Sequence, residues 1–351
     1  MSTKSKTLTS KQTDAATRSM RGGPLARVEH ASGHENGEAN GANGERLRVA
    51  KAYKMFVGGE FVRSESGRYF QVEGQTKFAS RVTTRHDLPK VGQADPDVVN
   101  IPRGSRKDAR DAVLAAKNAE TAWAGRTAFN RGQILYRLAE MMESRRSELE
   151  AMLVSGGASE KNASREVDAS IDRAMFYAGF SDKFQALLAS SNPVAGPHFN
   201  FSITEPMGVV AVVAPEGPSL LGLVSTVLPA IVAGNVVVAI ASEDDPRTAI
   251  VWCECIATSD LPKGVINVLT GSPKEIAPIL AKHREVIGMD VWTTDTELSA
   301  TIEKEGADNV KRVKAHREFS DADWLDERVG QGIGFIERFL ETKTVWHPVG
   351  M

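Results

Sequence analysis

The sequence predicts an α/β protein built on a Rossmann-like, doubly wound parallel sheet. After residue 208, apolar runs alternate with helical stretches that begin near residues 219, 246, 273 and 296; the runs are GVVAVV, NVVVAI, GVINVL and a weaker one near MDVWT. Continuous apolar runs are typical of strands covered on both faces, and strand–helix alternation is typical of a parallel sheet. Before residue 208 the pattern is mainly helical.

Residues 1–50 are predicted to form a disordered tail. They lack aliphatic periodicity, and GHENGEANGANGE at 33–45 is of low complexity. The first 28 residues carry several basic side chains and a single acid, Asp14. An organellar transit peptide has the same composition, so targeting stays open beside the simpler interpretation of a solvated tail.

Residues 51–207 are predicted to form an N-terminal helical region with a projecting hairpin. A β-hairpin is expected at 53–72 around Gly58–Gly59, followed by a long loop at 76–100. Ser105 and Asp108 form a capping box that opens a first helix. A second helix is expected from about 130 to 152 and a third over 163–189. Residues 187–204 are expected to form the projecting hairpin, since Phe199, Phe201 and Ile203 alternate with polar residues.

The remaining chain divides into a Rossmann-like domain at 208–319 and a C-terminal segment at 320–351. The segment is predicted as a linker, a helix and a strand at 342–347. In the stretch VVAPEGPSLLGLV at 212–224, the first strand of the domain turns into a helix. Such turns carry the polar groups that meet cofactor and substrate in α/β enzymes. Here the turn offers Glu216, Gly217, Pro218 and Ser219, and no amide side chain.

Composition excludes several classes of function. The chain has 351 residues, 41% apolar and 25% charged, with a formal net charge of −2. It has no basic stripe interleaved with aromatic residues, so nucleic-acid binding is not expected. No apolar run reaches membrane-spanning length, and the seven histidines form no metal-binding motif. Only two cysteines are present, which fits a reducing compartment, and we expect a cytoplasmic protein.

Several segments together resemble the aldehyde dehydrogenase superfamily. They are FVGGEFVRSESGR, WAGRTAFNRGQILYRLAEMME, MFYAGFSDKF, TEPMGVVAVVAP, LPAIVAGNVVVAI, SDLPKGVINVLTGS and FLETKTVWHP. The resemblance covers most of 53–313 and again 333–348. Within the superfamily, the chain resembles most the short class-16-type second subunits or second halves, which lack the catalytic lobe.

The resemblance implies a degenerate catalytic site. The family uses a Cys nucleophile in a Gly-Gln-x-Cys segment, an Asn that stabilises the oxyanion and a Glu base. Gly217 falls on the Asn position, and His316 falls on the position of the base. After about residue 319 the chain passes directly to the terminal helix and strand, so the catalytic lobe is expected to be absent. The segment Gly330–Gln331–Gly332–Ile333 imitates the motif but has Ile333 in place of Cys.

The cofactor positions implied by the resemblance are also altered. Ile240 stands where the family has a cofactor-binding Lys, whereas Glu243 is retained and could face a ribose. Thr294 and Asp295 replace the Gly-Ser pair that binds pyrophosphate at a helix N-terminus. Asp295 can cap that helix itself and would repel a pyrophosphate. We therefore expect no NAD(P) binding, or weak binding.

Four further residues have both a structural and a functional interpretation. Gly271 and Ser272 could contact a nucleotide, although a strand-to-helix turn requires Gly and a cap in any case. Cys253 and Cys255 stand two residues apart on a helix, so they cannot share a metal ion or form a redox pair. We expect them to fill space rather than to act as a displaced nucleophile.

The sequence therefore predicts a catalytically silent subunit. The resemblance implies that the segments 187–204 and 342–347 build the oligomer, and a full-length aldehyde dehydrogenase paralogue is the expected partner, with a homo-oligomer as the other outcome. Two alternatives stay open. The chain could be an active NAD(P)-dependent oxidoreductase acting on aldehydes, or a nucleotide-sensing module.

Overall fold

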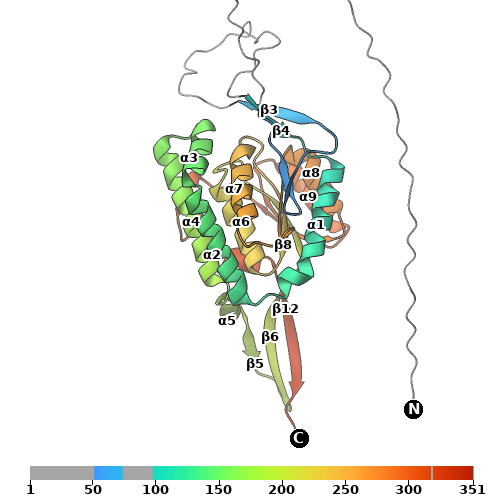
Figure 1. Ribbon diagram of the computed structural model, residues 1–351. Helices are drawn as coiled ribbons and strands as arrows, with labels where there is room; N and C mark the ends of the chain where they lie inside the picture. Colours follow the sequence, from blue (N-terminus) through green and yellow to red (C-terminus); the bar gives the residue numbers. More distant parts are fainter. Residues whose placement is uncertain (1–50, 74–97, 318, 351) are drawn as a thin grey trace, which may run out of the picture. The chain divides into compact units, whose positions relative to one another are not determined.

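The computed structural model describes residues 51–73, 98–317 and 319–350 (Figure 1). These residues belong to one compact unit, Leu47–Met351. The tail predicted at 1–50 and most of the loop predicted at 76–100 lie outside the described residues. Residues 98–100, at the end of that predicted loop, are instead the start of a strand, β4 (Val98–Pro102), which pairs with β3 (Tyr69–Glu73).

The predicted doubly wound sheet is confirmed. Its parallel strands are arranged in the order β11-β10-β7-β8-β9, and the predicted N-terminal hairpin, β1 and β2, extends the sheet beyond β9. One strand, β11, was missed because Arg312, Lys314 and His316 give its sequence a polar alternation rather than an apolar run. The strands are β1 (Met55–Val57), β2 (Glu60–Val62), β7 (Val209–Val213), β8 (Val236–Ile240), β9 (Ile266–Leu269), β10 (Val286–Trp292) and β11 (Arg312–His316).

Four helices connect the parallel strands, and they begin within about two residues of the predicted positions. They are α6 (Leu221–Val232), α7 (Pro246–Thr258), α8 (Pro273–Lys282) and α9 (Thr296–Ala307). Every residue of α6 is buried, because helices α2 and α4 cover the side that faces away from the sheet. Figure 1 shows α2, α3 and α4 beside α6 and α7, and α1 beside α8 and α9 on the other side.

The N-terminal helices are shorter than the sequence predicts. The predicted second helix is two helices, α2 (Ala128–Ser144) and α3 (Arg146–Ser155), because Arg145 leaves helical geometry at φ −108° and ψ 17°. The predicted third helix is also two helices, α4 (Glu160–Phe180) and the short α5 (Phe184–Leu188). The first helix, α1 (Arg106–Ala124), begins with the predicted capping box of Ser105 and Asp108.

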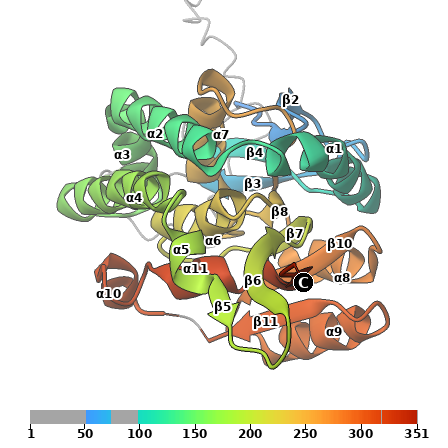
Figure 2. The ribbon, with the colours of Figure 1, turned by 90° about the horizontal axis from the view of Figure 1, so that it is seen from below.

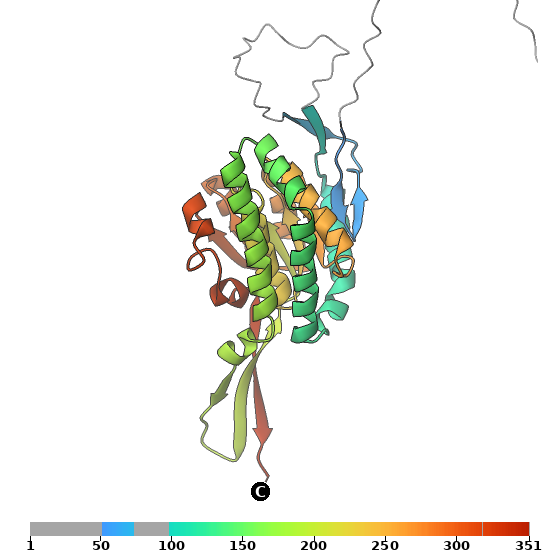
Figure 3. The same cartoon turned by 60° about the vertical axis from the view of Figure 1, so that its left-hand side comes forward.

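A separate three-stranded sheet projects from the end of the body at which β7 begins (Figures 1 and 3). It consists of the predicted hairpin, β5 (Ser190–Asn192) and β6 (His198–Pro206), together with the terminal strand β12 (Leu340–Pro348). The terminal strand pairs with β6 along its whole length. One edge of β12 is therefore occupied within the chain, and the other has no partner among the described strands.

Two short helices connect β11 with β12. They are α10 (Asp321–Leu325) and α11 (Ile333–Glu337), and Figure 2 shows both of them at the side of the sheet that ends with β11. The segment between the Rossmann-like sheet and the projecting sheet thus contains no further strand or long helix among its described residues. None of the helices in the described ranges has the length and apolarity to cross a membrane.

We predict that Asp108→Ala lowers the free energy of unfolding by about 1–2 kcal/mol. The Asp108 carboxylate accepts hydrogen bonds from Ser105 N at 2.8 Å and from Ser64 Oγ at 2.7 Å, so its loss removes the helix cap and a tie to the preceding loop. Urea denaturation measures the change. Asp111→Ala, at an exposed position one turn along α1, is the control and should leave stability nearly unchanged; equal effects of the two changes would contradict the prediction.

Candidate functional site

The carboxyl ends of the parallel strands bring most of the predicted site residues to one edge of the sheet. Gly217 follows β7, Glu243 follows β8, Ser272 follows β9, and Asp295 follows β10. In doubly wound folds this edge carries the ligand site. The arrangement predicted from the sequence is therefore present, and the chemistry depends on what the turns offer.

The turn after β7 offers no amide side chain that could stabilise an oxyanion. A Cβ atom placed on Gly217 would meet nothing within 4 Å, so packing does not require glycine there. The neighbouring Glu216 turns its carboxylate toward the end of β8. Its Oε2 accepts hydrogen bonds from Ser242 Oγ at 2.8 Å and from the backbone N–H groups of Glu243 at 2.8 Å and Asp244 at 3.1 Å. Burial nevertheless raises the pKa of Glu216.

A second carboxylate reaches this edge from α4. Glu166 Oε1 accepts hydrogen bonds from the backbone N–H groups of Leu220 at 2.8 Å and Leu221 at 3.2 Å, where α6 begins without a capping side chain of its own. Burial raises the pKa of Glu166, although the two bonds act in the opposite direction. No local sequence pattern points to this residue, because its partners stand 54 and 55 positions further along the chain.

A third carboxylate caps α9, as predicted. Asp295 Oδ1 accepts a hydrogen bond from Leu298 N at 2.9 Å, and its other oxygen lies 2.7 Å from Lys274 Nζ. The hydrogen bond with Lys274 holds the pKa of Asp295 below its usual range. Thr294, beside it, is exposed. The ion pair therefore joins the N-terminal ends of α8 and α9 across the turn at which the family binds pyrophosphate.

The other predicted cofactor positions are occupied by internal contacts. Ile240 is fully buried at the end of β8, between Val213 and Leu269 of the neighbouring strands. Ser272 Oγ donates to Glu243 Oε2 at 3.0 Å, which brings two of the predicted residues together in an exposed pair.

Gly271 has a clear structural role. It has φ +123°, and a Cβ there would lie 2.9 Å from the backbone nitrogen of Gly104. A side chain at Gly271 would collide with the segment that precedes α1, so this turn needs glycine without any ligand.

His316 belongs to a polar cluster and not to an open site. Its Nε2 lies 2.7 Å from Asp290 Oδ1, and its ring stacks on Trp292 with centroids 4.1 Å apart. Arg338 Nη1 donates to the same Asp290 oxygen at 3.1 Å. The Nε2 nitrogen of His316 is thus already engaged by Asp290. Asp290 and Arg338 were not identified from the sequence, because the contacts join positions 48 residues apart.

The two cysteines are buried in α7, as the space-filling interpretation predicts. Burial raises the pKa of Cys255 to about 12 and raises the pKa of Cys253 as well. The Ile333 position of the imitated motif begins α11 and supplies no nucleophile. No group of His, Cys, Asp and Glu residues in the described part of the chain is arranged to hold a metal ion.

These residues do not fit a nicotinamide dinucleotide. Backbone N–H groups at the sheet edge would hold a pyrophosphate, yet at three turns they donate to the chain's own carboxylates, Glu166, Glu216 and Asp295. The nearby cations are also paired, Lys274 with Asp295 at 2.7 Å and Arg247 with Asp245 at 2.9 Å. A phosphate at this edge would meet negative charge instead of free donors.

The comparisons of this chain with family models and with curated proteins agree on one family. Residues 88–317 match the model of the "Aldehyde dehydrogenase family". The chain is 31% identical over 276 residues to cytosolic 10-formyltetrahydrofolate dehydrogenase of Mus musculus, covering 77% of this chain and 28% of that protein. It is 30% identical over 302 residues to retinal dehydrogenase 2 of Gallus gallus, covering 81% and 54%.

Solved structures show the same fold. The NAD+ complex of an aldehyde dehydrogenase from Bacillus cereus superimposes with a TM-score of 0.66 at 23% identity, over 76% of this chain and 51% of that chain. The chain therefore spans about half the length of the dehydrogenases it matches, and a smaller share of the 10-formyltetrahydrofolate dehydrogenases.

We predict that both cysteines of the folded protein are inert to a chromogenic thiol reagent at mildly alkaline pH. Their raised pKa values leave few thiolates, and burial prevents access. Reaction should begin only as the protein unfolds, so the same reagent in denaturant, where both thiols react, is the control. Rapid reaction of one thiol in the native protein would contradict this assignment.

Proposed function

The chain belongs to the aldehyde dehydrogenase family, and from this premise we propose that it is a non-catalytic subunit that assembles with an active dehydrogenase. The observation that carries the proposal is the occupation of the sheet edge by internal carboxylates. Glu166, Glu216 and Asp295 take the backbone donors that would serve a cofactor. A site that satisfies its own donors gains little from a dinucleotide and retains no preorganised oxyanion hole.

The absence of a reactive thiol supports the same conclusion. Cys253 and Cys255 are buried within α7, away from the sheet edge, with raised pKa values. A thiol must become a thiolate to add to an aldehyde carbonyl. The described residues thus provide neither the nucleophile nor the amide that would stabilise its adduct.

The projecting sheet supports assembly as the function. Its central strand β6 has an apolar face on which Phe199 and Ile203 are 50% and 37% exposed. On the opposite face, Trp346 of β12 is 60% exposed. Among the described strands, β12 pairs only with β6, which leaves its second edge open along nine residues. An open strand edge with exposed aromatic residues favours addition of a strand from another chain.

The partner follows from the family and the geometry. This chain covers only 51% of the Bacillus cereus dehydrogenase, and its described residues between β11 and β12 form only two short helices. We propose that such a full-length dehydrogenase receives the open edge of β12. A homo-oligomer through the same sheet is the other outcome of the experiments below.

We predict that the protein forms no NADH from simple aldehydes and gives no saturable heat with NAD or NADP in calorimetry. Replacing two carboxylates of the edge, Glu216→Gln with Asp295→Ser, should raise NAD affinity by on the order of tenfold or more, because it removes like charge facing the pyrophosphate. The control is Asp111→Ser with Glu303→Gln, which changes the total charge equally at exposed positions. Micromolar NAD affinity of the unaltered protein would favour an active or nucleotide-sensing protein.

We predict that Trp346→Ala weakens association with the partner dehydrogenase by about 30-fold, the effect of losing an aromatic anchor of about 2 kcal/mol. Copurification from the native source identifies the partner, and analytical ultracentrifugation of the purified chains measures association. The matched control is Tyr69→Ala, which removes an aromatic side chain that is 61% exposed on the two-stranded sheet of β3 and β4. A chain that stays monomeric with every family member present would contradict the proposal.

A further inference from the structure

A groove of about 450 Å³ lies between α1 and α8, apart from the sheet edge described above. Its walls are two turns of α1 and the last two turns of α8, helices that lie side by side in Figure 1. The residues that line it are Arg106, Arg110, Pro278, Ile279, Lys282 and His283. This volume lies in the range of small-molecule pockets.

The groove is basic, and none of the described residues that line it is acidic. Arg106 and Arg110 stand four positions apart, so they extend from the same side of α1. Neither forms an ion pair with a described residue, whereas Lys282 lies 3.1 Å from Glu305. Arg106 is also in the first turn of α1, where a positive charge opposes the helix dipole. Two guanidinium groups are thus placed together at a cost, without an internal anion to offset it.

His283 adds a directed donor. Its Nδ1 lies 3.3 Å from the backbone N–H of Glu285 and accepts a hydrogen bond from it. In the neutral ring the proton therefore resides on Nε2, the nitrogen that remains for a ligand. Burial lowers the pKa of His283, and the charges of Lys311 and Arg110 lower it further, while Glu285 opposes them. Burial, together with these positive charges, disfavours protonation of the ring in the absence of an anion.

Pro278 and Ile279 give the groove an apolar strip beside its charges. Together they occupy the turn of α8 before Lys282 and His283. A free anion would contact the basic groups and leave this strip in water. A ligand that unites an anionic group with an apolar body would use both parts.

We propose that this groove binds the phosphate monoester group of a small organic molecule. Planar guanidinium groups match the geometry of phosphate oxygens and bind them through paired hydrogen bonds, and Arg106 and Arg110 supply two such groups. The imidazole of His283 supplies a third donor, and the apolar strip receives the carbon skeleton. The site is independent of the sheet edge, so it does not rest on the non-catalytic role proposed above.

Calorimetry with phenyl phosphate, inorganic phosphate and phenol tests the proposal on the full chain. Phenyl phosphate should bind with one-to-one stoichiometry and at least about tenfold more tightly than inorganic phosphate, because only the ester also covers the apolar strip. Phenol should not bind. Equal affinity for phenyl phosphate and inorganic phosphate, or no saturable heat with phenyl phosphate, would overturn the proposal.

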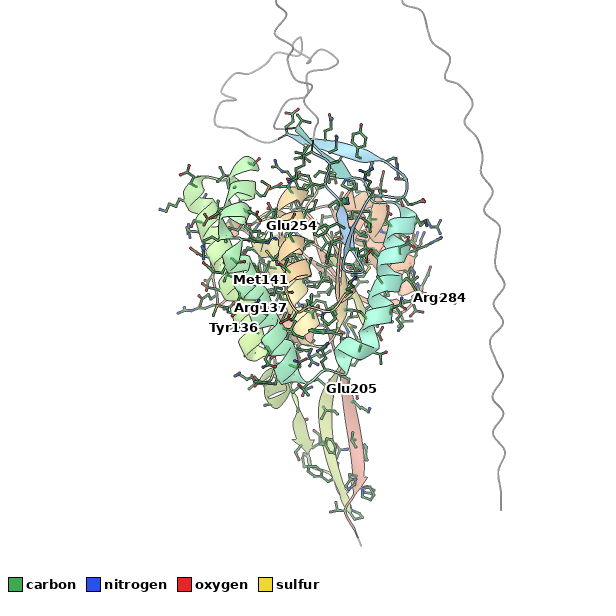
Figure 4. The ribbon with its side chains drawn as sticks, viewed as in Figure 1. Tyr136, Arg137, Met141, Glu205, Glu254 and Arg284 are labelled. Atoms are coloured by element: carbon green, nitrogen blue, oxygen red, sulfur yellow. The ribbon has the colours of Figure 1, made fainter. Side chains whose placement is uncertain are left out.

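Matched arginine variants locate the site. Arg110→Gln should weaken phenyl phosphate binding by about tenfold or more. Arg284→Gln removes the same charge from an exposed residue next to His283 that does not line the groove, and it should leave affinity within about twofold (Figure 4 labels Arg284). Equal losses in both variants would show non-specific attraction and overturn the assignment.

The histidine ring gives a readout of its own. Saturation with phenyl phosphate should raise the pKa of His283, which an NMR titration measures. A dianion beside the ring offsets the positive charges of Arg110 and Lys311, which lower this pKa, and those of Arg106 and Lys282, which line the groove. The NMR chemical shifts of the His198 ring, on the projecting sheet, should not change at constant pH. Vesicles of phosphatidic acid present the same phosphate group on a lipid. If the protein binds these vesicles but not phenyl phosphate, the proposal of a soluble ligand is overturned.

Discussion

A single buried carboxylate joins the C-terminal part of the chain to the sheet. Asp290, fully buried in β10, accepts hydrogen bonds from Trp292 Nε1 at 2.8 Å and Arg338 Nη1 at 3.1 Å and lies 2.7 Å from His316 Nε2. A buried charge without partners is strongly unfavourable, so β11 and α11 must both be in place when the fold closes. Arg338 stands just before β12, and the start of that strand is held as well by Arg312 Nη1, which donates to Leu340 O at 2.7 Å. Glu205, at the base of the projecting sheet in Figure 4, adds an ion pair of 2.8 Å with Lys343.

The same principle operates at the sheet edge. A helix N-terminus and a strand-to-helix turn present backbone N–H groups that need an acceptor, and a phosphate is one acceptor among several. Glu166, Glu216 and Asp295 fill this need from within the chain. At these turns the backbone donors that the three carboxylates engage have partners within the chain itself. The edge keeps the strand-to-helix turns of a doubly wound fold and adds three carboxylates to them.

Local patterns predicted most of the fold, and long-range contacts account for the rest. The apolar runs fix β7 to β10, and the spacing of Ser105 and Asp108 fixes the start of α1, because the determining residues are neighbours in sequence. The cap by Asp295 was predictable for the same reason. Glu166 and Arg338 act on residues about 50 positions away, so no local pattern points to them. The pairing of β12 with β6 also depends on a distant strand, and its register follows only from the folded chain.

The two faces of the projecting sheet explain why it can stay exposed. On one face Asn192 Nδ2 donates to Ser202 Oγ at 3.0 Å, and Ser202 lies 2.9 Å from Thr344 Oγ1, so short polar side chains hold the three strands together by hydrogen bonds. The other face carries Phe199 and Phe201, with ring centroids 5.4 Å apart. The polar network stabilises the strands without a hydrophobic core beneath them, and the apolar face is thereby left available. The projecting sheet and the basic groove of α1 and α8 are therefore the surfaces for which we propose functions.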